Sequence, residues 1–370
     1  MLETRIVESL TDVDRGQWMS LFPDEPEGYD YLVAVEQAGL RGFRWRYLMV
    51  FDADRIVAAA PAFLTEYPLE TTLAGGGRRL AESLQKLAPG LLTLRLACLG
   101  SPCCEVAQMG FAPDLEPAAR DAATRALLDA FDAEAQRQRC GVLGLKDVAR
   151  PATTRWARVA EAAGYRAISG LPTAVLDIDF PDSETYLAGL SPGTRKDMRR
   201  KLKTRDSIRI EVRGDIGDEI DAVMPLYVQT RARAEMTLEE LTPEFFIGVG
   251  RQMPGRAVYV LYYQGNDLLA VNLLIQDAGI LLDKFFCMDA ARGRPLNLYF
   301  LSWFTNVELC LARGLYRYQA GQAAYLNKVR LGSRLEPTAN YFRHRNILVN
   351  GALRLAAPLF GAGPMEREAA

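Results

Sequence analysis

The stretch that decides the fold is Ala257–Met288, which reads AVYVLYYQGNDLLAVNLLIQDAGILLDKFFCM. It contains three apolar runs, at residues 257–263, 268–276 and 280–288. Short polar, glycine-containing sequences, QGND and DAG, separate these runs, and both are typical of β-hairpin turns. The stretch therefore predicts three consecutive antiparallel strands.

A helix, a strand and a second helix follow these three strands. The first helix is predicted at 295–313, because Pro295 suits the first turn of a helix and Gly314 suits the position just after its end. The next strand is predicted at 316–319 and the second helix at 323–331. This order indicates an α/β (α+β) protein with a mixed, mostly antiparallel sheet flanked by helices.

The length of 370 residues favours two domains. The first half repeats the pattern more weakly, with predicted strands at 46–51, 56–65 and 142–148 and a predicted helix at 117–139. A helix that ends at Gly164 closes this half, and the pattern then begins again. We therefore expect two domains, residues 1–165 and 166–360, followed by a disordered tail at 361–370.

The composition, 49% hydrophobic and 24% charged with a net charge of −2, is that of an ordinary soluble globular protein. The single histidine, His344, excludes metal sites built from several histidines, and we expect no metal. Six cysteines are too few for a disulfide scaffold, so we expect them to be buried as small apolar residues. No signal peptide and no membrane-spanning apolar run is apparent, which favours a cytoplasmic protein with no membrane partner.

A dense basic block occupies residues 194–205 and reads TRKDMRRKLKTR. On a helix, Arg195, Arg199 and Lys203 share one face. This face could bind the phosphates of tRNA or of coenzyme A, an acidic carrier protein, or only water; it lacks the aromatic residues that interleave RNA-binding surfaces. The general excess of arginine over lysine fits a GC-rich bacterial genome and does not by itself indicate a function.

The most specific motif is Tyr316–Gly332, YRYQAGQAAYLNKVRLG. A predicted strand ends in a small-residue turn with Gly321, and Tyr325, Lys328 and Gly332 follow. Together with the basic Ser-Pro-Gly-Thr-Arg-Lys sequence that starts at Ser191, this motif resembles the Fem-type, BioF2-like branch of the acyl-CoA N-acyltransferase (GNAT) superfamily. The resemblance implies two tandem GNAT-like domains, of which residues 1–165 are a degenerate copy and residues 166–360 are the acyltransferase domain.

The resemblance also implies a pair of strands that splay apart around the pantetheine arm of acyl-CoA or of an acyl carrier protein. The donor's pyrophosphate would lie at the start of the helix between these strands, where free N–H groups favour anions. The residues implied at this donor site are Phe286, Met288, Arg292, Gly293, Arg294, Leu296 and Lys328.

Three residues are candidates for proton transfer. The resemblance implies that Tyr325 protonates the departing thiolate, although its ring could equally be only part of the wall. Asp283, between apolar neighbours in its strand, could act as a base or could pair with an arginine. His344, flanked by two arginines, could also act as a base or be structural, and ordered water could replace both.

We therefore expect an N-acyltransferase that moves an acetyl or longer acyl group, including a fatty acyl group, from a CoA or carrier-protein thioester to an amine of a small molecule or peptide. One alternative is an aminoacyl-tRNA-dependent peptidyl transferase, since Fem-type enzymes use that donor. The other is a non-catalytic binding protein that has kept the fold.

Overall fold

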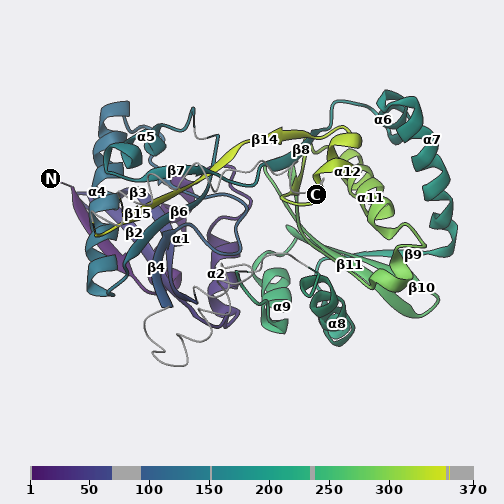
Figure 1. The fold of residues 1–370 in the computed structure, drawn as a ribbon, viewed down its shortest axis with the longest axis horizontal. Helices are drawn as coiled ribbons and strands as arrows, with labels where there is room; N and C mark the ends of the chain where they lie inside the picture. Colours follow the sequence, from purple (N-terminus) through teal and green to yellow (C-terminus); the bar gives the residue numbers. More distant parts are fainter. Residues whose placement is uncertain (1, 69–92, 151, 234–237, 347–349, 351–370) are drawn as a thin grey trace, which may run out of the picture. The chain divides into compact units, whose positions relative to one another are not determined.

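The computed structural model describes residues 2–68, 93–150, 152–233, 238–346 and 350. The tail predicted at 361–370 lies outside these residues, as do a loop at 75–79, a helix to about 87 and a strand near 347–349 that the sequence pattern also predicts. Contacts divide the chain into two compact units (Figure 1). Of the described residues, those up to 23, those between 41 and 171 and those from 337 to 350 belong to unit 1, and those from 24 to 40 and from 172 to 336 belong to unit 2. This division differs from the expected boundary at 165/166, because each unit takes a segment from the other half of the chain.

Unit 1 contains a sheet in the order β1-β2-β3-β4-β6-β15-β7, with β5 paired to β3. The strands are β1 (Glu3–Val7), β2 (Phe43–Asp52), β3 (Arg55–Pro68), β4 (Thr93–Leu99), β5 (Gly110–Phe111), β6 (Val142–Ala149), β7 (Arg166–Ser169) and β15 (Thr338–His344). Its α-helices are α1 (Arg15–Leu21), α4 (Pro117–Arg137) and α5 (Arg155–Ala162). The strand pairs are antiparallel except β4 and β6, which run parallel on either side of the α4 connection.

Unit 2 contains a sheet in the order β14-β8-β13-β12-β11-β10-β9. The strands are β8 (Thr173–Asp177), β9 (Arg209–Arg213), β10 (Ala257–Gln264), β11 (Asp267–Asp277), β12 (Ile280–Met288), β13 (Arg317–Gly321) and β14 (Arg334–Glu336). Its α-helices are α2 (Tyr29–Gln37), α6 (Ser183–Gly189), α7 (Pro192–Lys201), α8 (Ile220–Arg231), α9 (Pro243–Gln252), α10 (Ala290–Gly293), α11 (Leu298–Ala312) and α12 (Tyr325–Arg330).

The three strands predicted from Ala257–Met288 are confirmed as β10, β11 and β12, and they pair antiparallel in that order. The helix predicted from Pro295 begins later, at Leu298. Asn297 takes a left-handed conformation with φ of 55° at the N-cap, so the short helix α10 and α11 are separate elements. Asparagine tolerates this conformation better than most residues do.

The sheet of unit 2 is covered on both faces. Figure 1 shows α8 and α9 on one face and α11 on the other. The α11 face holds a large apolar core to which Tyr262, Leu274, Leu281 and Phe304 contribute. These strands are buried on both sides, which explains why β10 reads as a continuous apolar run rather than an alternating one.

Each unit also contains one segment from the other half of the chain: α2 belongs to unit 2, and β15 belongs to unit 1. Helix α2 packs on α9 in unit 2, where Thr242 Oγ1 donates to the Ala38 carbonyl at 2.6 Å and the rings of Tyr31 and Phe245 meet edge to face. Strand β15 pairs with β6 and β7 in unit 1. Both additions depend on contacts between residues far apart in sequence, which local patterns do not encode.

Candidate functional site

The central feature of unit 2 is the point where two parallel strands separate. β12 and β13 pair over three positions, Ile280 with Arg317, Leu281 with Tyr318 and Leu282 with Gln319. β12 then continues through Met288 along β11, while β13 ends at Gly321. We call this point the strand fork, and we call residues 283–288 and 320–321 its two arms. It confirms the pair of splayed strands that the sequence predicted.

A buried polar network lies at the strand fork on the α11 face. The Tyr318 hydroxyl donates to Asp283 Oδ2 at 2.7 Å, and Asn306 Nδ2 of α11 lies 2.9 Å from the Tyr318 hydroxyl and 3.3 Å from Asp283 Oδ2. Tyr318 and Asn306 are fully buried. Burial, and then the negative charge of Asp283, raise the pKa of Tyr318 well above its usual value, so its phenol stays protonated. The network fixes β12, β13 and α11 to one another at the fork.

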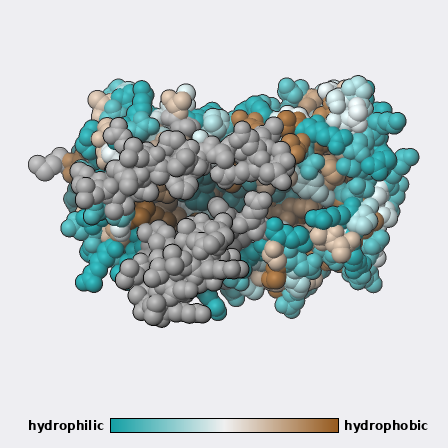
Figure 2. Space-filling model, in the orientation of Figure 1, coloured by the Kyte–Doolittle hydropathy of each residue, from teal (hydrophilic) through white to brown (hydrophobic). Residues whose placement is uncertain are grey.

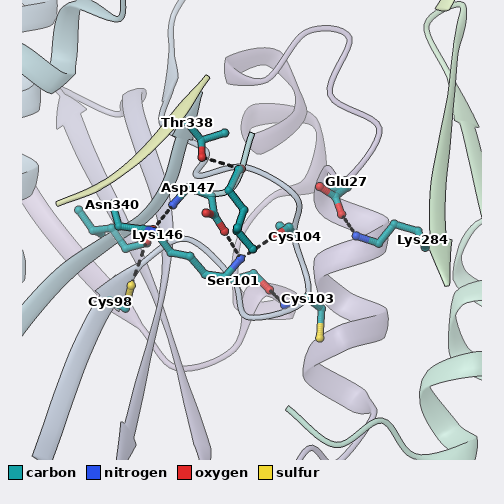
Figure 3. Close-up of polar contacts among 12 residues, drawn as sticks. Glu27, Cys98, Ser101, Cys103, Cys104, Lys146, Asp147, Lys284, Thr338 and Asn340 are labelled. Atoms are coloured by element: carbon teal, nitrogen blue, oxygen red, sulfur yellow. Dashed lines mark hydrogen bonds and ion pairs between the residues drawn. The ribbon is translucent and has the colours of Figure 1, made fainter. Parts of the chain in front are cut away.

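A second charged group lies on the opposite face of β12. The register of β12 against β11 shifts at Lys284, which is the extra residue of a β-bulge. Lys284 forms an ion pair with Glu27, which precedes α2, and both side chains are almost completely buried; they point toward one another in Figure 3. The Lys284 ammonium also lies 5.2 Å from the centre of the Tyr31 ring. The bulge therefore places a carboxylate on one face of β12 and a cation on the other at consecutive positions.

The β13 arm carries the motif that suggested the family. Gly321 has φ of 76°, a conformation that favours glycine, and the chain then enters α12. Lys328 is buried and donates to the carbonyls of Ala320 and Gly321. Tyr325 is also buried, and its hydroxyl donates to the Pro172 carbonyl at 2.9 Å. Both predicted residues thus lie on α12, the helix that follows this arm, and each donates to backbone carbonyls.

The β12 arm leads to the predicted phosphate-binding turn. Asp289 caps α10 by accepting from the N–H groups of Ala291 and Arg292. A Cβ on Gly293 would lie 2.5 Å from the Met288 sulfur, so a larger residue here would require the Met288 side chain to move.

Polar contacts hold α10 and the turn that follows it to the rest of unit 2. Exposed Arg292 pairs with Asp267 at 2.7 Å, and the Leu296 carbonyl accepts from Thr204 at 2.7 Å. Arg294 is exposed, while Phe286 packs edge to face with Tyr299 of α11. The predicted donor residues of this turn and of β12 therefore lie along one arm and the turn that follows it.

The basic block forms α7 and a following 3-10 turn. Asp197 is surrounded by three cations, Arg200 at 2.7 Å, Lys201 at 3.2 Å and Arg330 at 2.8 Å. Burial acts to raise the pKa of Asp197, but hydrogen bonds from these cations outweigh it and hold that pKa at about 2. The three cations thus keep an excess of positive charge, and Figure 2 shows a mainly hydrophilic surface over α7.

The basic block also contacts the start of α11. The Lys201 ammonium lies 3.5 Å from the centre of the Phe300 ring, and Thr204 bonds the turn before α11 as described above. The block is therefore continuous with the predicted phosphate-binding turn.

The third candidate for proton transfer, His344, belongs to unit 1. It is the last residue of β15 in unit 1, where it pairs with Val142. The His344 Nδ1 accepts from the backbone N–H of Asn346 at 3.0 Å, and the backbone N–H of His344 donates to the side-chain oxygen of Asn350. Asp283, Tyr325 and Lys328 belong to unit 2, so a role for His344 beside them stays a prediction.

Sequence reasoning missed three residues of this site: Glu27, Asn306 and Tyr318. Tyr318 was within the motif, but nothing in its spacing indicated a bond to Asp283. Glu27 lies more than 250 residues before Lys284, so only the placement of the segment before α2 in unit 2 could reveal it.

The cysteines are buried as expected, and all six are free thiols. Among the residues that the structure describes, no group of three or more histidine, cysteine, aspartate or glutamate side chains could hold a metal ion. The described helices include none long and apolar enough to cross a membrane.

Three solved structures share the fold of this chain. FemX aligns with a TM-score of 0.60 and 12% identity over 95% of this chain and 100% of its own. A tandem GNAT protein from the clavulanic acid biosynthesis pathway aligns with a TM-score of 0.54 and 14% identity over 93% and 98%. The L-PGS protein of Bacillus licheniformis aligns with a TM-score of 0.51 and 11% identity over 92% and 99%. These likenesses establish a tandem GNAT fold.

Sequence comparison gives the family. Two strains of Mycobacterium tuberculosis carry a provisionally named 8-amino-7-oxononanoate synthase 2 that is 24% identical over 326 residues. The match covers 86% of this chain and 42% of each relative, so this chain spans less than half the length of these relatives. The FemAB-like family, described as acting in peptidoglycan biosynthesis or recognition, matches residues 113–353. The chain belongs to the FemAB-like family and has the GNAT fold of its Fem-type members.

Proposed function

We propose that this protein transfers an acyl or aminoacyl group from an activated donor to an amine, and that the strand fork of unit 2 is where the transfer occurs. The observation that carries this proposal is the limited pairing of β12 with β13, which leaves two strand arms with polar groups on each. The FemAB-like family and the fold shared with GNAT proteins support it.

The reaction has a simple balance. The neutral amine attacks the carbonyl carbon of the donor, a C–N bond forms, and the bond from that carbon to sulfur or oxygen breaks. The leaving group takes the electron pair and a proton from the attacking nitrogen. The acceptor amine must already have lost one proton, because an ammonium ion has no lone pair.

The leaving group would depart along the β13 arm. We assign to Lys328 the role of stabilising its negative charge, since the ammonium is buried at the end of that arm, where a charge acts strongly. Tyr325 is the proposed proton donor: its hydroxyl exchanges its bond to the Pro172 carbonyl for one to the leaving group and gives that group its proton. The proton released by the attacking nitrogen then restores the phenol, so the net transfer is from nitrogen to the leaving group.

Asp283 is better suited to positioning than to proton abstraction. Its carboxylate accepts from Tyr318 and Asn306, and a base there would have to release these bonds. We propose that it holds the α11 face of the fork in place for the donor.

The donor's phosphate groups would lie between the turn that contains Arg292, Gly293, Arg294 and Leu296 and the basic block. Both are rich in arginine, which binds phosphate through two parallel hydrogen bonds. Phe286 and Met288 would line the acyl-bearing arm, where apolar surface suits a thioester longer than acetyl. Acyl-CoA and acyl carrier protein are the proposed donors.

Aminoacyl-tRNA is the second candidate donor. The basic block favours it, because Arg200, Lys201 and Arg330 present more positive charge than Asp197 neutralises. The family description favours an acceptor amine on a peptide of the peptidoglycan type, and a small-molecule amine is the alternative.

A transfer assay tests the proposed function. Acetyl-CoA, a long-chain acyl-CoA, acyl carrier protein loaded with the same chain, and aminoacyl-tRNA are each incubated with the protein and a mixture of primary amines, and amide products are measured by mass spectrometry. We expect one donor to give amide and to raise the melting temperature. Absence of amide and of stabilisation with all four donors would favour a non-catalytic binding protein.

Variants then test the assigned roles. We expect Tyr325→Phe to slow transfer by about tenfold or more, while Tyr316→Phe, a change at an exposed tyrosine, leaves the rate unchanged. Lys328→Arg should retain more activity than Lys328→Met, because it keeps the charge. Equal rates for the wild type and Tyr325→Phe would remove Tyr325 from the reaction.

A further inference from the structure

Helix α12 has two faces of different character. Its inner face carries Tyr325 and Lys328, which are buried. Its outer face carries Leu326, Val329 and Arg330, three exposed residues that are neighbours on a helix because they stand at i, i+3 and i+4. Leu326 and Val329 keep 52% and 41% of their surface exposed. The outer face of α12 is therefore an apolar surface that ends in an arginine.

Arg330 joins this apolar pair to the basic helix α7. Its guanidinium donates to Thr194 Oγ1 at 3.2 Å and to Asp197 Oδ2 at 2.8 Å. The apolar pair and the exposed cations of α7 therefore belong to neighbouring helices of unit 2. We call six exposed residues of these two helices the α7–α12 surface: Lys196, Arg199, Arg200, Leu326, Val329 and Arg330.

The charge of the α7–α12 surface is unbalanced. Asp197 is the only acidic residue in α7 and α12, and three cations already contact it, as described above. Glu184 of α6 pairs with Arg199 at 3.1 Å, but both side chains are largely exposed, so this pair is weak. Within the described part of the chain, Lys196 forms no ion pair. The surface thus has a net positive charge, which favours a negatively charged partner.

The extent of the surface indicates a macromolecular partner. α7 has ten residues and is about 15 Å long, and α12 adds a second helix beside it. The phosphates of a coenzyme can contact only part of such a surface, whereas a macromolecule can cover both helices.

The apolar pair indicates which kind of macromolecule fits. Leu326 and Val329 are aliphatic, whereas RNA bases stack on aromatic side chains. An apolar centre with a charged rim is instead typical of contacts between proteins. The partner that fits is therefore a protein with an acidic helix that also carries apolar residues.

The α7–α12 surface lies next to the proposed reaction site. Tyr325 and Lys328 are on the inner face of α12, so the width of one helix, about 10–12 Å, separates them from a partner on the outer face. The turn that follows α7 reaches the predicted phosphate-binding turn, where Thr204 donates to the Leu296 carbonyl at 2.7 Å. A partner on this surface would border both the helix that follows the β13 arm and the turn that follows the β12 arm.

We propose that the α7–α12 surface binds a carrier protein that presents the acyl group as a thioester. This inference rests on the proposed function and selects the carrier-bound thioester among the donors proposed there. Leu326 and Val329 contact apolar residues of an acidic carrier helix, and the cations of α7 contact its carboxylates. The flexible arm of the carrier brings the thioester to the strand fork. There the C–N bond forms, the C–S bond breaks, and the carrier leaves as a free thiol with the proton from nitrogen.

The first test compares donors that differ only in what carries the acyl chain. Acetyl and palmitoyl chains are each offered on acyl carrier protein and on CoA to the full chain. The double variant Leu326→Glu with Val329→Glu replaces the apolar pair by acidic residues that a helix accepts well. We expect it to raise KM for the carrier-bound donor by about tenfold or more and to change KM for acyl-CoA by less than about twofold. Val228→Glu, the same change at an exposed valine of α8, is the matched control and should leave both unchanged.

The second test measures binding of acyl carrier protein without an acyl chain, by isothermal titration at two salt concentrations. We expect the wild type and Val228→Glu to bind it equally and more weakly at high salt. The double variant should bind about tenfold more weakly or worse. Lys196→Glu, at an exposed position of α7, should also weaken binding, so the test does not depend on one variant.

The outcomes separate this inference from the proposed function. Equal carrier affinity of the wild type, the double variant and Lys196→Glu would overturn the inference. Binding of tRNA or of anionic lipid vesicles, but not of the carrier, would also overturn it. Transfer from acyl-CoA without any binding of the carrier would overturn the inference and leave the proposed function standing. Carrier binding that the double variant loses, without transfer from any donor, would support the docking surface and overturn the proposed function.

Discussion

The two units contain equivalent parallel strand pairs that end differently. In unit 1, β4 and β6 pair from Leu96 with Val142 to Leu99 with Leu145, and the chain then turns back across this point. The Ala107 N–H donates to the Asp147 carbonyl at 3.0 Å, and Lys146 donates to the Cys104 carbonyl at 3.1 Å. Figure 3 shows Lys146 beside Asp147 and Cys104. The unit 1 fork is thus closed by its own chain.

In unit 2 the corresponding strands lead away from each other. β12 continues into α10 and α11, and β13 turns at Gly321 into α12. The polar groups at this fork belong to the side chains of Asp283, of Tyr318 in the paired part of β13 and of Lys328 in α12. The comparison shows that a returning loop contacts the fork of unit 1, whereas the fork of unit 2, where we propose that the donor binds, is bordered by side-chain polar groups.

The largest effect we expect concerns the buried ion pair of unit 2. Lys284→Met leaves Glu27 buried without its cation and should lower the free energy of unfolding by about 3–5 kcal/mol. The double variant Glu27→Gln with Lys284→Met should recover most of that loss. Urea unfolding of the three proteins measures this, and a double variant as unstable as the single one would show that the pair itself carries the stability.

Glu25 should cost stability where it is ionised. The folded state raises its pKa from 4.5 to about 7, so the folded chain holds a proton that the unfolded chain releases between these values. The wild type therefore loses stability as pH rises through this window, by up to about 3 kcal/mol. We expect Glu25→Gln to be more stable than the wild type at pH 8 and equal to it at pH 4. Equal unfolding free energies at both pH values would contradict the raised pKa.

Matched changes at the two forks sharpen the comparison between the units. Asp147→Asn removes the carboxylate that pairs with Lys146 and should lower the free energy of unfolding by about 1–3 kcal/mol, with kcat/KM unchanged. Asp283→Asn keeps an acceptor for Tyr318 and should lower kcat/KM by about tenfold, with a smaller loss of stability. Chemical denaturation and steady-state kinetics distinguish the two patterns, and the reverse pattern would break the account.

The smallest effect concerns the basic block. Arg200→Gln removes one of three cations around Asp197 and should weaken donor binding only a few-fold, with the difference shrinking at high salt. The same change should alter aminoacyl-tRNA binding more than acyl-CoA binding, because a longer phosphate chain meets more of the block. Donor titrations at two salt concentrations measure this. An effect independent of salt would show that Arg200 acts through packing.

The fold could be predicted where its signals are local. The hairpins of Ala257–Met288 and the turn at Gly321 follow from nearby residues, and each was found as expected. The late start of α11 depends on the left-handed conformation of Asn297. The sequence did not indicate it, because Pro295 suits the first turn of a helix and so predicted an earlier start.

The composition of the site could be predicted only in part. The motif led to Tyr325 and Lys328, and both lie on α12, the helix that follows the β13 arm. It could not indicate that β15 carries His344 into unit 1 or that Glu27 reaches β12, because these placements arise from packing of distant segments. Nor could it indicate that Tyr318 donates to Asp283, because this hydrogen bond forms only when β12 and β13 lie side by side.

Hydrogen–deuterium exchange with and without donor tests the central claim, that the fork of unit 2 binds the donor while the fork of unit 1 does not. The full chain is compared alone and with saturating acetyl-CoA, long-chain acyl-CoA or aminoacyl-tRNA. We predict added protection at residues 283–288 and 320–328 with the donor that supports transfer, and no change at residues 100–108 and 146–149. Protection confined to the unit 1 segments would contradict the account.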